Sequence, residues 1–138
     1  MAMFDFHYYD HFAFDFDKFA SLPDDVIDGM LNAEADVIKK AQAKTARQML
    51  QGPYNKRVVE NALKLGRIKK TRDHKYMFVT FGGTQHGNEV SEIAFVNEYG
   101  KKGQPARPFI KAANEQHAEE AVDAAAKVYD QYLNKIGF

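Results

Sequence analysis

Residues 92–109 read EIAFVNEYGKKGQPARPF, an apolar run followed by a glycine-flanked basic loop and a proline-rich segment. The short run Ile93–Val96 suits either a buried strand or a tight helical turn, and we interpret the wider segment Val90–Val96 as a strand. Gly100 and Gly103 permit backbone angles that other residues resist. The pattern therefore predicts a strand that leads into a turn.

The last residues of this stretch, Pro105–Phe109, are suited to the start of a helix. Pro105 and Pro108 fix φ and hold Arg107 between them, which restricts the direction of the arginine side chain. Pro108 also suits the first turn of a helix. We predict that the loop folds back so that Arg107 pairs with Glu98, or hydrogen-bonds carbonyls at the end of the Val90–Val96 strand.

Two long helices are predicted, one in the first half of the chain and one at its C-terminal end. Apolar residues recur at steps of three and four over Ile27–Leu50, and Gly52-Pro53 ends the pattern, which predicts a first helix of about 28 residues. The alanine-rich segment from Pro108 to about Ile136 has the same period and predicts the last helix. Alanine on its inner face indicates close packing against another helix, either within the fold or between subunits.

Shorter elements fill the middle of the chain. Asn55 is expected to cap a short helix that ends at Gly66, and Arg67–Thr71 and Tyr76–Phe81 are predicted strands. Gly82–Asn88 is a polar, glycine-rich loop of the kind found at hairpin tips. The expected fold class is therefore α+β, with a small antiparallel β-sheet packed against long N-terminal and C-terminal α-helices.

Residues 1–19 form a separate feature, an arm dense in aromatic residues. Most of these aromatics, Phe4 and Phe6 among them, fall on even positions, so the arm is expected to be extended with one apolar face. Phe12–Asp17 fits a strand best, and Met1–Asp10 fits a second strand or a mobile arm. Because each buried aromatic contributes about 1.5–3 kcal/mol, the arm should dock on its own domain or on a neighbour.

The chain carries no net charge, but its charges are segregated. The segment Met1–Asp36 holds nine acids and one base, whereas Lys39–Lys75 holds twelve bases and two acids. Such blocks indicate complementary patches within the fold or between copies, or simply solvated faces.

The densest group of bases surrounds the predicted strands, and it consists of Lys64, Arg67, Lys69, Lys70, Arg72 and Lys75. With Tyr76 and Phe78 beside them, these bases are suited to contact a nucleic-acid backbone. The alternatives are an exposed sheet edge protected by lysines, or a patch that pairs with the acidic segment of a neighbouring copy.

Length and composition narrow the classes of function. The 138 residues suit one domain over 1–138, and the absence of cysteine excludes disulfides and thiolate zinc sites. His7 and His11 have a helical metal spacing, but an extended chain would separate them, so we expect neither metal nor cofactor. No catalytic spacing stands out, and we expect no enzymatic activity. No apolar run approaches the roughly 20 residues of a membrane span, so a soluble protein made in the cytoplasm is expected.

The order of motifs around residues 98–113 resembles a family of small structural proteins of long-tailed bacteriophages, known as minor tail components, tail-completion proteins or head–tail joining (neck) proteins. A glutamate-tyrosine-glycine triplet, a short basic loop, a proline-rich string and an alanine-rich helix carry the resemblance, at Glu98, Tyr99, Gly100, Pro105, Arg107, Pro108, Phe109 and Ala112-Ala113. The layout of a long first helix, a central sheet and a long last helix also fits. The aromatic arm lies outside the pattern.

The resemblance implies a virion structural protein at the head–tail junction or the tail end of a phage, made in the cytoplasm of the bacterial host. Its implied partners are copies of itself in a ring, a hexamer first and a dodecamer second, neighbouring neck or tail proteins, and DNA through non-specific contact. We expect the contacts to involve the motif and the arm, at Phe4, Phe6, Glu98, Tyr99, Gly100, Arg107, Pro108 and Phe109. A nucleic-acid-binding accessory protein that uses residues 64–75 is the alternative.

Overall fold

The structure is a computed structural model that describes residues 4–5, 22–50, 52–72, 74–85 and 87–137. Its elements follow in the order β1 (Phe4–Asp5), α2 (Asp24–Met49), α3 (Pro53–Ala62), β2 (Leu63–Leu65), β3 (Lys69–Lys70), β4 (Lys75–Tyr76), β5 (Phe78–Phe81), β6 (Thr84–Gln85), β7 (Asn88–Glu89), α4 (Val90–Tyr99) and α5 (Phe109–Lys135). Both long helices lie where the apolar period predicted them, and the α+β class is confirmed.

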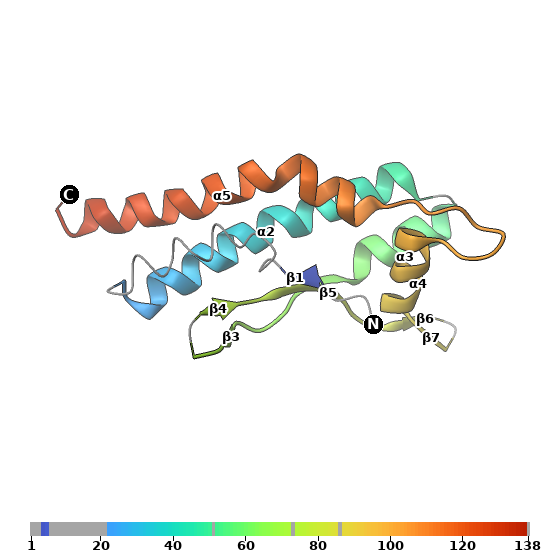
Figure 1. Ribbon diagram of the computed structural model, residues 1–138, viewed down its shortest axis with the longest axis horizontal. Coiled ribbons are helices and arrows are strands. Elements are labelled where there is room, and N and C mark those ends of the chain that lie inside the picture. Colours follow the sequence, from blue (N-terminus) through green and yellow to red (C-terminus); the bar gives the residue numbers. More distant parts are fainter. Residues whose placement is uncertain (1–3, 6–21, 51, 73, 86, 138) are drawn as a thin grey trace.

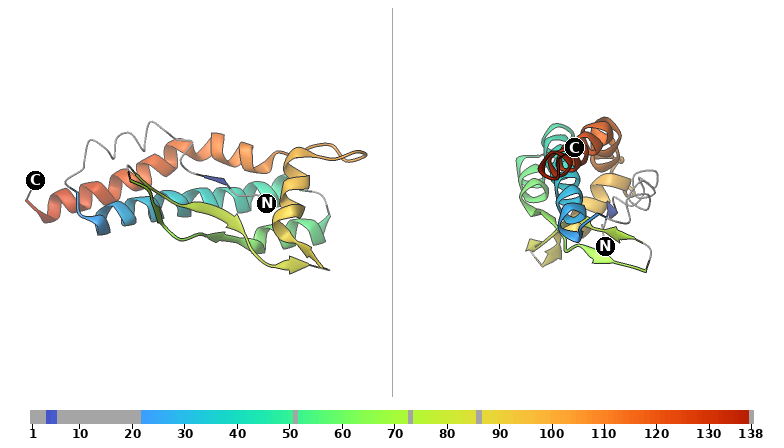
Figure 2. Two further views of the ribbon diagram at one scale, coloured as in Figure 1. Left: turned by 60° about the horizontal axis from the view of Figure 1, so that its bottom comes forward. Right: turned by 90° about the vertical axis from the view of Figure 1, so that its left-hand side faces the viewer.

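Helix α2 lies between α5 and the strands, as both views of the ribbon show (Figures 1 and 2). The two long helices run antiparallel, because Gln42 of α2 bonds to Asn114 near the start of α5, whereas Gly29 packs against Val128 near its end. A Cβ added at Gly29 would lie 3.3 Å from Val128. Fully buried alanines such as Ala121 continue this seam, which confirms the predicted close helix packing.

The largest sheet has three antiparallel strands in the order β1-β5-β2. Phe4 is paired with Val79 on one side of β5, and Leu65 is paired with Val79 on the other. Alternate residues of this central strand, Val79 and Phe81, are buried beneath α2, whereas Phe78 and Thr80 are half-buried. The sheet therefore covers the core with one face and leaves its other face toward the outside.

The arm is described only at Phe4–Asp5, which forms β1 on the edge of β5 in the same chain. The extended conformation that the aromatic alternation predicts is confirmed for these two residues. The preferred strand Phe12–Asp17 and the side chain of Phe6 lie outside the described residues.

The short middle elements differ from the prediction at their boundaries. Asn55 lies inside α3 and does not cap it, because the helix already begins at Pro53, a residue suited to the first turn. The helix ends at Ala62 rather than at Gly66, since Leu63–Leu65 is taken up by pairing with β5. At the far end of the chain, the last helix was expected to reach about Ile136, and α5 ends one residue earlier at Lys135, which leaves Ile136 49% exposed.

The predicted strand Val90–Val96 is wrong, because these residues form the first part of helix α4. The residues that α4 buries recur with the helical period, at Val90, Ser91, Ala94, Asn97 and Glu98. A short apolar run fits a strand and a helix equally well, and here tertiary packing decides for the helix.

One buried carboxyl group in α2 has no counter-charge among the described residues. Glu34 is 2% exposed, and its Oε1 atom accepts no hydrogen bond from any described residue. Glu34 and Thr45 are eleven residues apart and thus share one face of α2, and Thr45 contacts α5. Burial raises the pKa of Glu34 from 4.5 to about 7.

We predict that Glu34→Gln stabilises the protein in a pH-dependent way. The raised pKa means that the folded state favours the protonated carboxyl group of Glu34. The stability that this protonated group contributes is therefore fully present below pH 4.5 and is lost as the pH rises through about 7. The neutral amide avoids this loss. In urea denaturation the variant should gain up to about 3 kcal/mol at pH 8 and little at pH 5. An equal effect at both pH values would contradict the assignment.

Candidate functional site

The motif around residues 98–113 folds into one unit, the α4–α5 joint, which we define as residues 95–114. At its centre is the buried carboxylate of Glu98, near the end of α4. The N–H of Ile110 donates to Oε2 at 2.8 Å, and the N–H of Lys111 donates to Oε1 at 3.0 Å. The first N–H groups of a helix have no partner within it, so Glu98 satisfies two of them for α5. One side chain thus fixes the angle between two helices.

The protonation of Glu98 reflects two opposing effects. Burial raises the pKa of Glu98, and the two backbone donors together with the nearby charge of Lys111 lower it by a smaller amount. The side chain of Glu98 is therefore suited to hold a helix start in place, where charge-assisted hydrogen bonds offset part of its desolvation.

Arg107 does not pair with Glu98, and the predicted ion pair is wrong. No ion pair joins the two residues in the described part of the chain, and the carboxylate oxygens instead accept N–H groups of α5. The loop does fold back as expected, but through the main chain. The N–H of Arg107 donates to the carbonyl oxygen of Asn97 at 2.7 Å. The backbone therefore makes the contact that the sequence assigned to the guanidinium group.

A tight hairpin links the two helices. The N–H of Lys101 donates to Gln104 O at 3.0 Å, and the N–H of Gln104 donates to Lys101 O at 2.9 Å. Gly100 ends α4 with φ of +78°, and a Cβ there would lie 2.8 Å from the nitrogen of Ala106. Only glycine meets both conditions, so Gly100 is required for the hairpin to lie against the following segment.

The joint is also attached to α2. Thr45 Oγ1 donates to the carbonyl oxygen of Phe109 at 2.7 Å, and Gln42 Nε2 donates to Asn114 Oδ1 at 3.1 Å. The ring of Phe109 is fully buried and packs edge-on against Phe81, with ring centroids 6.1 Å apart. Phe109 therefore belongs to the core and is not available for the interface role expected of it.

The outer side of the joint exposes a pair of aromatic rings. Phe95 is 47% exposed and Tyr99 is 61% exposed, and their ring centroids lie 4.7 Å apart on the solvent side of α4. Lys101 and Lys102 are exposed just beyond them. We call these four residues the aromatic–basic end. The sequence pointed to Tyr99 but missed Phe95, because the helical spacing of four residues was hidden by the strand interpretation.

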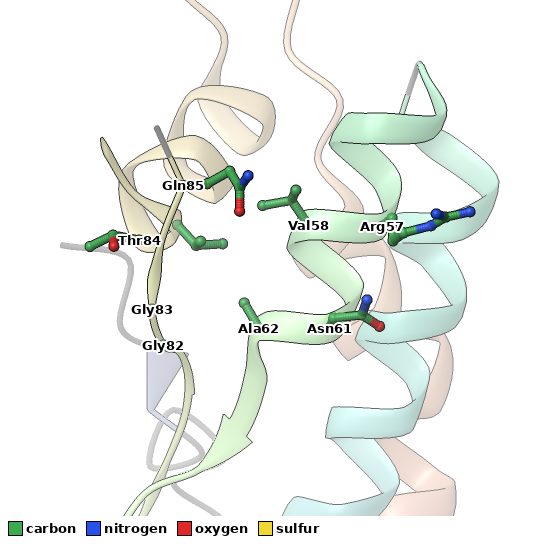
Figure 3. A pocket seen from close by; sticks show the side chains of 9 residues that line it. Arg57, Val58, Asn61, Ala62, Gly82, Gly83, Thr84 and Gln85 are labelled. Atoms are coloured by element: carbon green, nitrogen blue, oxygen red, sulfur yellow. The ribbon is translucent and has the colours of Figure 1, made fainter. Parts of the chain in front are cut away.

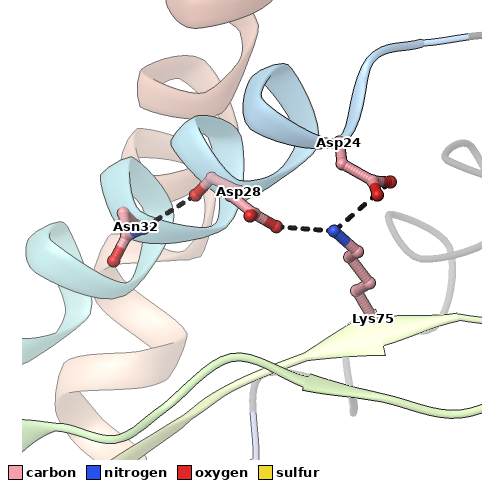
Figure 4. A network of polar contacts seen from close by, with 4 residues as sticks. All are labelled: Asp24, Asp28, Asn32 and Lys75. Carbon is pink, nitrogen blue, oxygen red and sulfur yellow. Dashed lines mark hydrogen bonds and ion pairs between the residues drawn. The ribbon is translucent and has the colours of Figure 1, made fainter.

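The basic cluster of residues 64–75 does not form one continuous surface. Lys75 turns toward α2, where its Nζ lies 2.8 Å from Asp28 Oδ1 and 3.4 Å from Asp24 Oδ1 (Figure 4). The hydrogen bond to Asp28 raises the pKa of Lys75. Register places Lys69 beside Tyr76 and Lys70 beside Lys75, on opposite faces of the β3–β4 pair.

The other bases of the cluster are exposed, namely Lys64, Arg67, Lys69, Lys70 and Arg72. Lys69 Nζ lies 5.1 Å from the centre of the Phe78 ring, a cation–π distance. Part of the segregated charge is therefore complementary within the fold, between the acidic start of α2 and Lys75. The remaining bases offer a patch smaller than the sequence suggested.

A cleft of about 620 Å³ separates α3 from the segment Gly82–Gln85. Val58 and Gln85 point into it from opposite sides, and Ala62 lies at its base (Figure 3). Arg57 is the one charged residue among those that line it. Among the described residues that line it, none is a carboxylate or a histidine suited to acid–base chemistry.

The described residues hold neither a metal cluster nor a membrane-spanning helix. Within the described ranges, no group of three or more acids and histidines is placed to hold a metal ion, and His7 and His11 lie outside those ranges. No helix in the described part of the chain is long and apolar enough to cross a membrane. No family model matches the chain, and neither curated proteins nor solved structures gave a match.

We predict that two glycines of the hairpin respond differently to alanine. Gly100→Ala would bring Cβ into the backbone of Ala106, whereas Gly103, with φ of +83°, has no atom within 4 Å of an added Cβ. Gly103→Ala should cost about 1–2 kcal/mol, the left-handed strain alone. Gly100→Ala should cost clearly more in urea denaturation, because steric overlap adds to the same strain. Equal losses would contradict the close approach.

Proposed function

We propose that the protein is a structural component of a bacteriophage virion, at the head–tail junction or the tail end, and that its copies assemble into a ring. The observation that carries the proposal is the aromatic–basic end, Phe95, Tyr99, Lys101 and Lys102, held on the α4–α5 joint. The joint contains the residues on which the resemblance to phage tail and neck proteins rests, and Phe95 lies just outside that set. The proposed site is a protein–protein interface.

The exposed ring pair supports an interface for an energetic reason. Aromatic residues are enriched in the buried centre of protein interfaces and supply much of the binding energy there. Phe95 and Tyr99 already contact one another, so little side-chain entropy remains to be lost on binding. The hydrogen bonds of Glu98 hold the backbone beneath them. The surface is therefore organised before a partner arrives.

The position of the aromatic–basic end favours a head-to-tail contact. It lies at one end of an elongated molecule, where α3, α4 and the hairpin gather (Figure 1). A surface at one end that binds a different surface of the next copy produces a closed ring or an open filament. The phage resemblance favours the ring, with a hexamer before a dodecamer.

We predict that Phe95→Ala with Tyr99→Ala weakens self-association at least about tenfold, since two interface aromatics carry more than 1.4 kcal/mol. Sedimentation velocity over a series of protein concentrations measures the effect, and circular dichroism checks the fold. Ile136→Ala is the matched control, because Ile136 is as exposed as Phe95 but lies outside the joint. A double variant that assembles as well as the wild type would contradict the proposal.

The same samples separate this function from nucleic-acid binding. An accessory protein acting through residues 64–75 would bind DNA with an affinity that falls steeply between low and moderate salt. Such binding in a wild-type protein that remains monomeric would favour that alternative and would exclude the ring.

A further inference from the structure

The outer face of α5 carries a row of acidic side chains. Glu115, Glu119 and Asp123 follow one another at steps of four residues, and all three are exposed. They lie on the side of the helix opposite Ala121 and Ala125, which are fully buried. We call these three acids the acidic stripe. None of them forms an ion pair with another described residue.

A row of acids alone is an ordinary solvated helix face. The aromatic–basic end supplies a second surface of opposite charge. Its Lys101 and Lys102 also lack an ion pair with any described residue. Elsewhere in the molecule charges of opposite sign do meet, as Lys75 does with Asp28. Two unpaired surfaces of opposite charge therefore remain on the same chain.

The two surfaces do not meet within one copy in the described part of the chain. The hairpin lies at the N-terminal end of α5 and projects beyond α4, whereas α5 runs in the opposite direction along the molecule (Figures 1 and 2). Asp123 is fourteen residues from Phe109, which corresponds to about 21 Å along the helix. Two hydrogen bonds between Lys101 and Gln104 hold the hairpin in its own conformation. A contact between the surfaces requires a second copy.

We propose that the aromatic–basic end of one copy docks on the acidic stripe of the next copy. This inference rests on the proposed self-assembly and names the surface that receives the aromatic–basic end. Lys101 and Lys102 would lie against the stripe carboxylates. The rings of Phe95 and Tyr99 would pack beside exposed Ala126, where a small side chain lets a ring approach the helix backbone closely.

This pairing accounts for direction as well as attraction. The donor surface is at one end of the molecule and the receiving surface is on its flank, so each copy uses two different surfaces. That arrangement leaves one free surface of each kind until the ring closes. Complementary charge also opposes the wrong contacts, end to end or flank to flank, because like charges would then meet.

The experiment is a charge exchange between two variants. The first variant reverses the charge of the aromatic–basic end by Lys101→Glu with Lys102→Glu. The second reverses most of the charge of the acidic stripe by Glu119→Lys with Asp123→Lys. Each variant alone brings like charges together and should associate at least about tenfold more weakly than the wild type. Mixed in equal amounts, the two should associate again and alternate, because each end then faces a stripe of opposite charge.

A third variant controls for general charge attraction. Lys70→Glu with Arg72→Glu changes the net charge as much as the end variant does, at two exposed residues outside both surfaces. It should assemble like the wild type, and mixing it with the stripe variant should not produce alternating assemblies. Native mass spectrometry distinguishes alternating from uniform assemblies by mass, and circular dichroism confirms that each variant is folded.

The outcomes separate this inference from the proposed function. Recovery in the mixture of end and stripe variants supports the pairing. If the wild type assembles and the reversals leave assembly unchanged, the pairing is wrong while the ring stands. If each reversal abolishes assembly and the mixture does not recover, the two surfaces bind other partners and the pairing is again wrong. A wild type that stays monomeric at every concentration contradicts both proposals.

Discussion

The two hydrogen bonds from the start of α5 to Glu98 fix the arrangement on which the rest of the molecule depends. They set where α5 begins relative to α4, and Thr45 then holds the same point of α5 against α2. The antiparallel packing of the two long helices continues from that position along the alanine seam. The hairpin between α4 and α5 and the exposed ring pair follow from the same geometry, since both belong to the joint.

Glu34 and Glu98 show why a buried carboxyl group needs its partners. Both are nearly inaccessible to solvent, and burial raises the pKa of each. Glu98 accepts two backbone N–H groups that would otherwise lack acceptors, so its burial adds order at a helix end. Glu34 has one oxygen with no hydrogen-bond partner among the described residues, so its burial costs stability once it ionises. A buried glutamate thus stabilises the start of α5 at Glu98, whereas at Glu34 it lowers the stability of the fold once it ionises.

The sequence predicted those elements whose apolar periodicity extends over many residues. The apolar periods of α2 and α5 extend over many turns, and Gly52-Pro53 ends the first of them unambiguously. Val90–Val96 was too short for its period to decide between strand and helix, and that error also concealed Phe95 as a partner of Tyr99. The sequence pointed to Glu98 but predicted an ion pair with Arg107. Residue types alone do not reveal that both oxygens of Glu98 accept backbone N–H groups. Strand alternation likewise divided a basic cluster that is continuous in the sequence.

Amide hydrogen exchange at Ile110 and Lys111 tests most directly whether Glu98 organises the joint. In the wild type both amides should exchange slowly, although the first amides of a helix normally exchange fast because they lack partners. Glu98→Ala should remove this protection and increase exchange in the hairpin, whereas Glu92→Ala, an exposed glutamate on the same helix, should change neither. Protection at Ile110 and Lys111 that survives Glu98→Ala would contradict the account.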